Sequence, residues 1–381
     1  MNACLVCESP DLVPLLRLPE GLTITSLCKA VEGRVSSFFC RACGHVQTTP
    51  LPNLASYYAE DYQILAQSAE EDQLLTLSNG ELAFRLQHQA ETLLASIEIP
   101  PGGKVLDYGC AKAETLRRIC RIRTDVVPFC FDVSDDYSSF WETFVPRGNW
   151  STHRIREDWD SHFDLVTTFF ALEHVESPGD FVAEIHRVLR NGGRLYGIVP
   201  NLLTNHADLV VADHVNHFTI PSLERLLCDC GFSVIEVSVE KHPGALLFIA
   251  EKREPRRVSR PIEAGLEEQV MEIAGYWEGY VGKVREFENA HPGGEGVAIY
   301  GSGFYGSFIY ASLHQPAKVR YFIDQNPYRR KSLHLGLPVI PAEEIPAALN
   351  VLYVGLNPRI AKETIAGVEA LQGREISIFV P

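Results

Sequence analysis

The most constraining feature of this sequence is a regular alternation of strand-like and helix-like segments between about residues 80 and 252. The segments that we expect to form strands are 104–108, 126–132, 163–170, 193–199, 232–239 and 245–251. Several are nearly continuous apolar runs, which is typical of strands buried on both faces of a mostly parallel sheet. Helical patterns lie between them at 113–121, 178–190 and 220–230. The alternation predicts an α/β domain with a doubly wound sheet.

A second α/β segment follows a charged linker that contains Pro255 and Pro261. A long polar helical pattern occupies 263–290, and further strands are expected at 297–300, 319–324, 351–356 and 375–380. A chain of 381 residues has room for two or three domains. We therefore expect three domains, at 1–60, 61–255 and 256–381, of which the last is a second Rossmann-like α/β domain.

The charge balance argues against a nucleic-acid partner. The chain has 34 Lys and Arg against 49 Asp and Glu, a formal net charge of −15, which repels a phosphate backbone. No apolar run follows Met1, and no stretch reaches the roughly 18–20 apolar residues that cross a bilayer. We expect a soluble, cytoplasmic protein without a membrane partner. The sequence says nothing of its oligomeric state.

Two Cys-x2-Cys pairs near the N-terminus indicate a metal site. The pairs are Cys4 with Cys7 and Cys40 with Cys43, and Gly44 after the second pair suits a tight turn. Zinc favours four thiolates in a tetrahedron, and such a closed site is structural. The alternative is two reactive or unliganded thiol pairs. The other six of the ten cysteines are expected to be core thiols.

A glycine turn after the first predicted strand indicates a ligand site. Segment 104–116 has the pattern of strand, tight turn and helix, which places a helix N-terminus at the carboxyl end of the strand. Gly109 allows close approach of a ligand to the backbone, and Asp107 lies beside it. Asp132 ends the second strand, where a carboxylate suits ribose hydroxyls. This spacing fits S-adenosylmethionine (SAM) and NAD equally well.

Three ordered motifs resemble those of class I SAM-dependent methyltransferases. They are Leu106-Asp-Tyr-Gly-Cys110, the segment 163–175 and the Gly-Gly turn in 188–195. The resemblance implies that SAM is the cofactor and that Asp107, Gly109 and Asp132 contact it, with Asp158 as a weaker candidate for the adenine amino group. The family usually continues with two more glycines, which Ala111 and Ala113 replace here.

The whole chain resembles a narrower family, the C-methyltransferases that act on nucleotide-linked keto-sugars. The resemblance lies in segments 40–47, 57–62, 322–327 and 336–341 and in the order of the three domains. It implies an N-terminal zinc-binding domain, a central methyltransferase domain and a C-terminal substrate-binding domain, with Tyr62 near the substrate. A nucleotide-sugar is then the expected substrate.

That family uses a Tyr-x-Glu-His segment to remove a proton from the acceptor. The matching residues are 211–214, so the resemblance implies His214 as base and Asp213 as its acid partner. His174 matches a second histidine of the family, and His217 is expected to pack. Val211 stands where the family has Tyr. The methylated atom can therefore be carbon, oxygen or nitrogen.

The C-terminal domain contains a Gly-x-Gly-x-x-Gly loop between a strand and a helix. Its glycines are Gly301, Gly303 and Gly306, and Asp324 ends the next strand. This context favours a nucleotide or pyrophosphate site, and the resemblance assigns these residues to the nucleotide-sugar. The glycines could instead serve close packing. Two further alternatives stay open: an NAD(P)-dependent oxidoreductase that uses this loop, and a non-catalytic binding protein on a methyltransferase fold.

Overall fold

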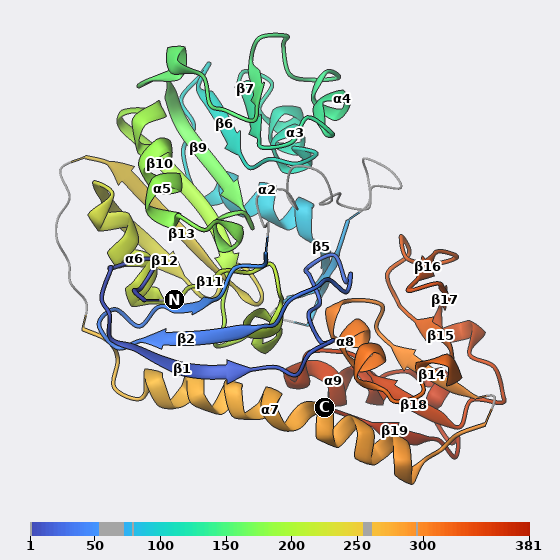
Figure 1. The fold of residues 1–381 in the computed structure, drawn as a ribbon. Coiled ribbons are helices and arrows are strands. Elements are labelled where there is room, and N and C mark those ends of the chain that lie inside the picture. Colours follow the sequence, from blue (N-terminus) through green and yellow to red (C-terminus); the bar gives the residue numbers. More distant parts are fainter. Residues whose placement is uncertain (1, 53–71, 78–79, 254–260, 295) are drawn as a thin grey trace. The chain divides into compact units, whose positions relative to one another are not determined.

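The chain forms two compact units, seen here in a computed structural model that describes residues 2–52, 72–77, 80–253, 261–294 and 296–381 (Figure 1). The first unit comprises Met1–Pro14, Phe38–Asn205 and His214–Glu268. The second comprises Leu15–Ser37, His206–Asp213 and Gln269–Pro381. The division is not sequential, because two short segments from earlier in the chain belong with the C-terminal unit.

The first unit is built on a seven-stranded sheet with the order β12-β13-β10-β9-β6-β7-β8. Its strands are β6 (Lys104–Tyr108), β7 (Val127–Asp132), β8 (Trp150–Thr152), β9 (Phe163–Phe169), β10 (Leu189–Pro200), β12 (Phe232–Ser238) and β13 (Ala245–Lys252). β13 is antiparallel to both of its neighbours, whereas the pairs from β10 to β8 are parallel. The strand order reverses between β6 and β9, and open α/β sheets usually bind their ligands at the carboxyl ends of the strands beside such a reversal.

Alternating side chains of the central strands build two separate cores. Val105 and Leu165 belong to one apolar cluster, and Leu106 and Val166, each the next residue, belong to the other. Figure 1 shows helices on both faces of the sheet. These helices are α2 (Arg85–Ser96), α3 (Glu114–Ile122) and α4 (Ser138–Trp141) on one face, and α5 (Pro178–Val188) and α6 (Ile220–Asp229) on the other. The apolar runs therefore form strands because both of their faces are covered.

The second unit has a six-stranded sheet with the order β16-β17-β15-β14-β18-β19. The strands are β14 (Val297–Tyr300), β15 (Val319–Ile323), β16 (Leu333–His334), β17 (Leu337–Ile340), β18 (Val351–Val354) and β19 (Ser377–Phe379). All neighbours are parallel except β16 and β17. Helices α8 (Phe304–Ser312) and α9 (Pro358–Ala366) belong to this unit, with most of α7 (Leu266–Ala290). The prediction of two Rossmann-like α/β sheets is confirmed.

The N-terminal residues contribute a small four-stranded sheet with the order β1-β2-β3-β11. Its strands are β1 (Leu12–Arg17), β2 (Ser36–Cys40), β3 (Val46–Thr48) and β11 (Asn216–His217), and β4 (Leu74–Thr76) and β5 (Leu82–Phe84) form a separate hairpin. Short 3-10 turns are η2 (Glu157–Trp159), η3 (Leu172–His174), η4 (His206–Val210), η5 (Pro316–Lys318), η6 (Ala342–Glu344) and η7 (Glu369–Leu371). Among the helices that the structure describes, none is both long and apolar enough to span a bilayer.

Candidate functional site

Asp107 lies at the carboxyl end of β6 and is only 2% exposed. Thr167 Oγ1, on the neighbouring strand β9, donates a hydrogen bond of 2.9 Å to its Oδ1. Burial raises the pKa of Asp107 to about 7; the hydrogen bond from Thr167 opposes this shift, and the charge of Asp132 adds to it. A carboxylate that is poorly solvated in this way is suited to pair with a cationic ligand group.

Asp132 ends β7 and joins that strand to the glycine turn. Its Oδ2 accepts a hydrogen bond of 2.7 Å from Ala111 N, and its Oδ1 accepts one of 3.1 Å from Ser134 N. Burial raises the pKa of this carboxyl group as well. Each carboxylate oxygen has two lone pairs, so both keep capacity for ligand hydroxyl groups.

The turn between β6 and α3 keeps left-handed backbone at three positions. Gly109 has φ +73°, and a Cβ there would lie 2.9 Å from Ala171 Cβ, at the end of β9. Ala111 and Ala113 have φ +43° and +53°, values that L-residues rarely adopt. The two alanines that replace the family's glycines therefore still form a turn with glycine-like backbone.

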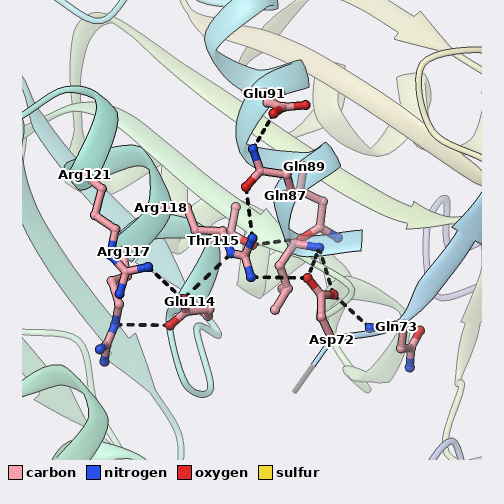
Figure 2. Close-up of polar contacts among 11 residues, drawn as sticks. Asp72, Gln73, Gln87, Gln89, Glu91, Glu114, Thr115, Arg117, Arg118 and Arg121 are labelled. Atoms are coloured by element: carbon pink, nitrogen blue, oxygen red, sulfur yellow. Dashed lines mark hydrogen bonds and ion pairs between the residues drawn. The ribbon is translucent and has the colours of Figure 1, made fainter. Parts of the chain in front are cut away.

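A polar network fixes the first turn of α3, directly after this glycine turn (Figure 2). Glu114, the first residue of α3, forms ion pairs with Arg117 (3.1 Å) and Arg118 (3.8 Å). Arg118 also lies 3.4 Å from Asp72, whose carboxylate accepts a hydrogen bond from Leu86 N in α2. These bonds fasten the start of α3 to α2 and so hold the turn in place.

Asp158 lies in η2, and its side chain is 62% exposed. Arg156 pairs with it at 2.6 Å and lies over the Trp159 ring. The guanidinium of Arg156 lowers the pKa of Asp158. The structure thus gives Asp158 an exposed ion pair, and its contact with adenine stays a prediction.

His174 and His214 meet at the carboxyl edge of the same sheet. Their ring centroids are 4.7 Å apart at an interplanar angle of 84°. Glu173, 1% exposed, joins them: one ligand atom of each of the three residues lies within 4.8 Å of the others. Sequence reasoning missed Glu173, although it directly precedes His174. The three side chains could share a proton or hold a divalent cation.

Backbone hydrogen bonds hold the two segments of this cluster together. Val215 N donates to Glu173 O at 2.8 Å, and Asn216 Nδ2 donates to Leu172 O and Val175 O at 3.2 and 2.7 Å. Asn216 belongs to β11, which pairs with β3 of the N-terminal sheet. His217 Nε2 lies 2.8 Å from Thr48 Oγ1 in a fully buried contact, as expected for a packing residue.

Asp213, the predicted acid partner, is fully buried in the second unit. Ser26 donates to both of its carboxylate oxygens, from the backbone N at 2.6 Å and from Oγ at 2.7 Å. Val211 is buried and forms a β-bridge with Ile24. The carboxylate of Asp213 therefore anchors residues 24–26, a contact that the sequence did not predict.

The four N-terminal cysteines converge as a ligand set. Cys4 Sγ lies 3.6 Å from Cys43 Sγ, Cys7 Sγ lies 3.6 Å from Cys40 Sγ, and all four sulfurs lie within 4.8 Å of one another. Four thiolates on one zinc ion, with bonds of about 2.3 Å, are about 3.8 Å apart. Gly44 has φ +73° and closes the second knuckle through a hydrogen bond from its N to Cys40 O. The donor set fits zinc in geometry and chemistry.

The glycine loop of the second unit is tightly packed at two of its three glycines. A methyl group on Gly301 would overlap Gly355 O, and one on Gly306 would overlap Gly301 O. At Gly303 a methyl group would meet nothing within 4 Å. Asp324 accepts hydrogen bonds from Ser302 N (2.9 Å) and Ser302 Oγ (2.6 Å). Close packing therefore accounts for Gly301 and Gly306, and only Gly303 leaves room for a ligand.

Tyr62, the remaining predicted substrate residue, lies outside the described residues.

Comparison with known proteins identifies the first α/β sheet. Residues 82–237 match the family model of a methyltransferase domain. This segment contains Asp107, Asp132, His174 and His214. Within these residues the chain is similar to a methyltransferase domain, and they form most of the seven-stranded sheet.

Solved structures of low identity cover a similar share of the chain. A Haloferax volcanii protein in complex with the Trm112 methyltransferase activator has 18% identity and a TM-score of 0.38, covering 45% of this chain and 91% of its own. A SAM-dependent methyltransferase from Mesorhizobium loti has 18% identity and a TM-score of 0.36, covering 44% and 99%. Geranyl diphosphate C-methyltransferase from Streptomyces coelicolor has 13% identity and a TM-score of 0.37, covering 44% and 79%. No curated protein sequence matches the chain.

Proposed function

We propose that the protein transfers the methyl group of SAM to a nucleotide-linked sugar. The matched methyltransferase domain supports methyl transfer. The resemblance of all three parts of the chain to the sugar C-methyltransferases supports this substrate class. The observation that carries the proposal is the cluster of His174, His214 and buried Glu173 at the edge of the methyltransferase sheet. The second Rossmann-like unit would then hold the nucleotide, and Gly303, where a methyl group would meet nothing within 4 Å, is its candidate contact.

Asp107, Gly109 and Asp132 would hold the cofactor. The poorly solvated carboxylate of Asp107 would pair with its cationic groups, the backbone at Gly109 would allow close approach, and Asp132 would accept hydrogen bonds from ribose hydroxyls. When bound, SAM supplies an electrophilic methyl group on a positively charged sulfur.

His214 would act as the base. A nitrogen of its ring would take a proton from the acceptor atom, and that atom would keep the electron pair with which it accepts the methyl group. The buried carboxylate of Glu173 favours the resulting imidazolium, and His174 lies where it can pass the proton on. Because Val211 supplies no phenol group, the acceptor atom can be carbon, oxygen or nitrogen.

Cys4, Cys7, Cys40 and Cys43 would hold one structural zinc ion per chain. A closed set of four thiolates leaves no position for substrate, so the metal would stabilise the fold and take no part in chemistry. Elemental analysis of the purified protein should find one zinc per chain, and none in a variant with two of the four cysteines replaced.

Mass spectrometry tests the function directly. The protein is incubated with SAM and a panel of nucleotide-linked keto-, amino- and hydroxy-sugars, and we expect one product heavier by a methyl group with an equal amount of S-adenosylhomocysteine. Loss of turnover in His214→Ala, with SAM affinity kept, would support the base. Binding of NAD in place of SAM, seen as a rise in Tm with NAD alone, would refute the proposal.

A further inference from the structure

A buried histidine with one unpartnered nitrogen lies outside the cluster of His174 and His214. His242, in the loop between β12 and β13, is 2% exposed. Its Nδ1 lies 3.1 Å from Pro243 O, so this nitrogen carries the proton and donates it to the carbonyl. Within the described part of the chain, Nε2 is buried without a hydrogen-bond partner. Buried polar atoms are almost always paired, so this nitrogen calls for a hydrogen-bond donor that the described residues do not supply.

The surroundings of His242 are aromatic and strained. Its ring lies 5.6 Å from that of Phe170 and 5.6 Å from that of His88. Phe170 has φ +54°, a conformation that a bulky residue adopts only where the structure forces it, and Arg85 lies 5.3 Å above its ring. Burial lowers the pKa of His242 to about 4, and nearby Arg85 and His88 add to the effect. The ring is therefore neutral, and its Nε2 can only accept a hydrogen bond.

The position of this loop favours the acceptor over the cofactor as that partner. Asn201 N, directly after β10, donates to Gly244 O at 3.0 Å, so the loop lies at the carboxyl edge of the sheet. β13 is three strands from β6 in the sheet. The residues proposed for SAM lie at the ends of β6 and β7, farther along in the same direction. Phe170, the residue directly after β9, lies between the two regions.

We propose that His242 Nε2 accepts a hydrogen bond from a hydroxyl or amino group of the acceptor and thereby selects acceptors that carry one. The inference rests on the proposed function, because the donor must belong to the acceptor. An acceptor with a carbonyl oxygen or a deoxy carbon at this position has no proton to give, and the site would reject it. His242 would be a specificity residue that touches the substrate away from the methylated atom.

Three variants test this role. His242→Phe keeps an aromatic ring but removes the accepting nitrogen, and His242→Gln places an amide oxygen near the position of Nε2. His186→Phe is the matched control, because His186 also packs edge-on against a phenylalanine, Phe232 at 5.1 Å, but lies on α5. With the acceptor found in the panel, His242→Phe should lower kcat/KM for the acceptor about 10- to 100-fold and leave the KM for SAM within about twofold. His242→Gln should recover part of the loss.

A binding experiment without turnover separates the two proposals. Protein labelled with 15N at histidine and saturated with S-adenosylhomocysteine is titrated with UDP-glucose and dTDP-glucose, and the Nε2 resonance of His242 is followed. A shift on addition of the sugar nucleotide, and none with S-adenosylhomocysteine alone, supports the inference. Binding without a response at Nε2, a response to S-adenosylhomocysteine alone, or unchanged kinetics of His242→Phe overturns it. Failure of every panel member to bind overturns the proposed substrate class instead, and this inference with it.

Discussion

Ala111 and Ala113 hold backbone conformations that usually belong to glycine. A left-handed alanine costs about 1–2 kcal/mol, and glycine at the same position avoids most of that cost while losing more entropy on folding. Each of Ala111→Gly and Ala113→Gly should therefore raise the free energy of unfolding by about 0.5–1 kcal/mol. Urea unfolding measures the change, with Ala90→Gly in the buried face of α2 as a control that should destabilise. A loss of stability in both turn variants would contradict the left-handed backbone at Ala111 and Ala113.

Asp107 makes the stability of the ligand-free protein depend on pH. Burial raises the pKa of its carboxyl group to about 7 from the ordinary 3.8, so the folded state holds the proton more tightly than the unfolded state. The stability that this group contributes is complete below about pH 4 and is lost as the pH rises to about 7. Asp107→Asn has no carboxyl group to titrate and so avoids this loss. The free energy of unfolding of the variant, relative to that of the unchanged protein, should rise by about 2–3 kcal/mol between pH 5 and pH 8.

Urea unfolding at pH 5 and pH 8 checks this dependence, with the exposed Asp135→Asn as control. The same variant should lose SAM affinity at pH 8, because the carboxylate that pairs with the cofactor is gone. An equal effect of Asp107→Asn at the two pH values would show that the carboxyl group titrates normally.

Glu173 and Asp213 should respond differently to loss of charge. Glu173→Gln removes the carboxylate beside His214, so we expect kcat to fall about 100-fold while SAM affinity is kept. Asp213→Asn weakens the two bonds from Ser26 and should lower the free energy of unfolding by about 1–3 kcal/mol. Because Ser26→Ala removes one of the same bonds, the double variant should be destabilised by less than the sum of the two single variants. Kinetics of Asp213→Asn that match those of Glu173→Gln would instead make Asp213 the acid partner of the base.

At the scale of elements, the pairing of β3 with β11 connects the cysteine cluster to His214, the proposed base. β3 begins three residues after Cys43, and β11 begins two residues after His214. Cys40→Ser should lose the metal, lower the Tm and reduce kcat more than it reduces SAM affinity. Zinc content, calorimetry and SAM titration measure the three effects. Cys120→Ser, a partly buried thiol of α3, is the control that should change none of them.

Most strands of the two large sheets could be predicted from sequence to within a few residues, because continuous apolar runs are buried on two faces. Strands β8, β11, β16 and β17 were not predicted; β8, β11 and β16 have only two or three residues, which carry no readable period. The left-handed backbone at Ala111 and Ala113 could not be predicted, because alanine ordinarily avoids that conformation. The contact between Asp213 and Ser26 could not be predicted, because the two residues are 187 positions apart in the sequence. Glu173 was overlooked although it stands beside a predicted residue, because only the fold shows its carboxylate to be buried near His214.

At the scale of the whole molecule, both units hold the turn after the first strand of their sheet with the same kind of hydrogen bond. In each, a carboxylate at the end of the second strand accepts a backbone N–H from the turn after the first, Asp132 from Ala111 and Asp324 from Ser302. The glycine requirements differ. Gly306→Ala should destabilise the second unit by more than about 2 kcal/mol, whereas Gly303→Ala should be tolerated. Weaker binding of a nucleotide-sugar to Gly303→Ala at unchanged Tm would support ligand contact there; equal binding would leave the loop a packing feature.

The pairing of β3 with β11 also bears on how the enzyme comes into being. Val46 and His217 are register partners, yet 171 residues separate them. A ribosome adds about 5–20 residues per second, so the N-terminal strand waits about 10–30 seconds for its partner to be synthesised. Contacts so distant in sequence also form slowly. All four cysteines of the proposed zinc site are synthesised long before the segment with His214, so a nascent chain would hold the complete ligand set well before it has the proposed base.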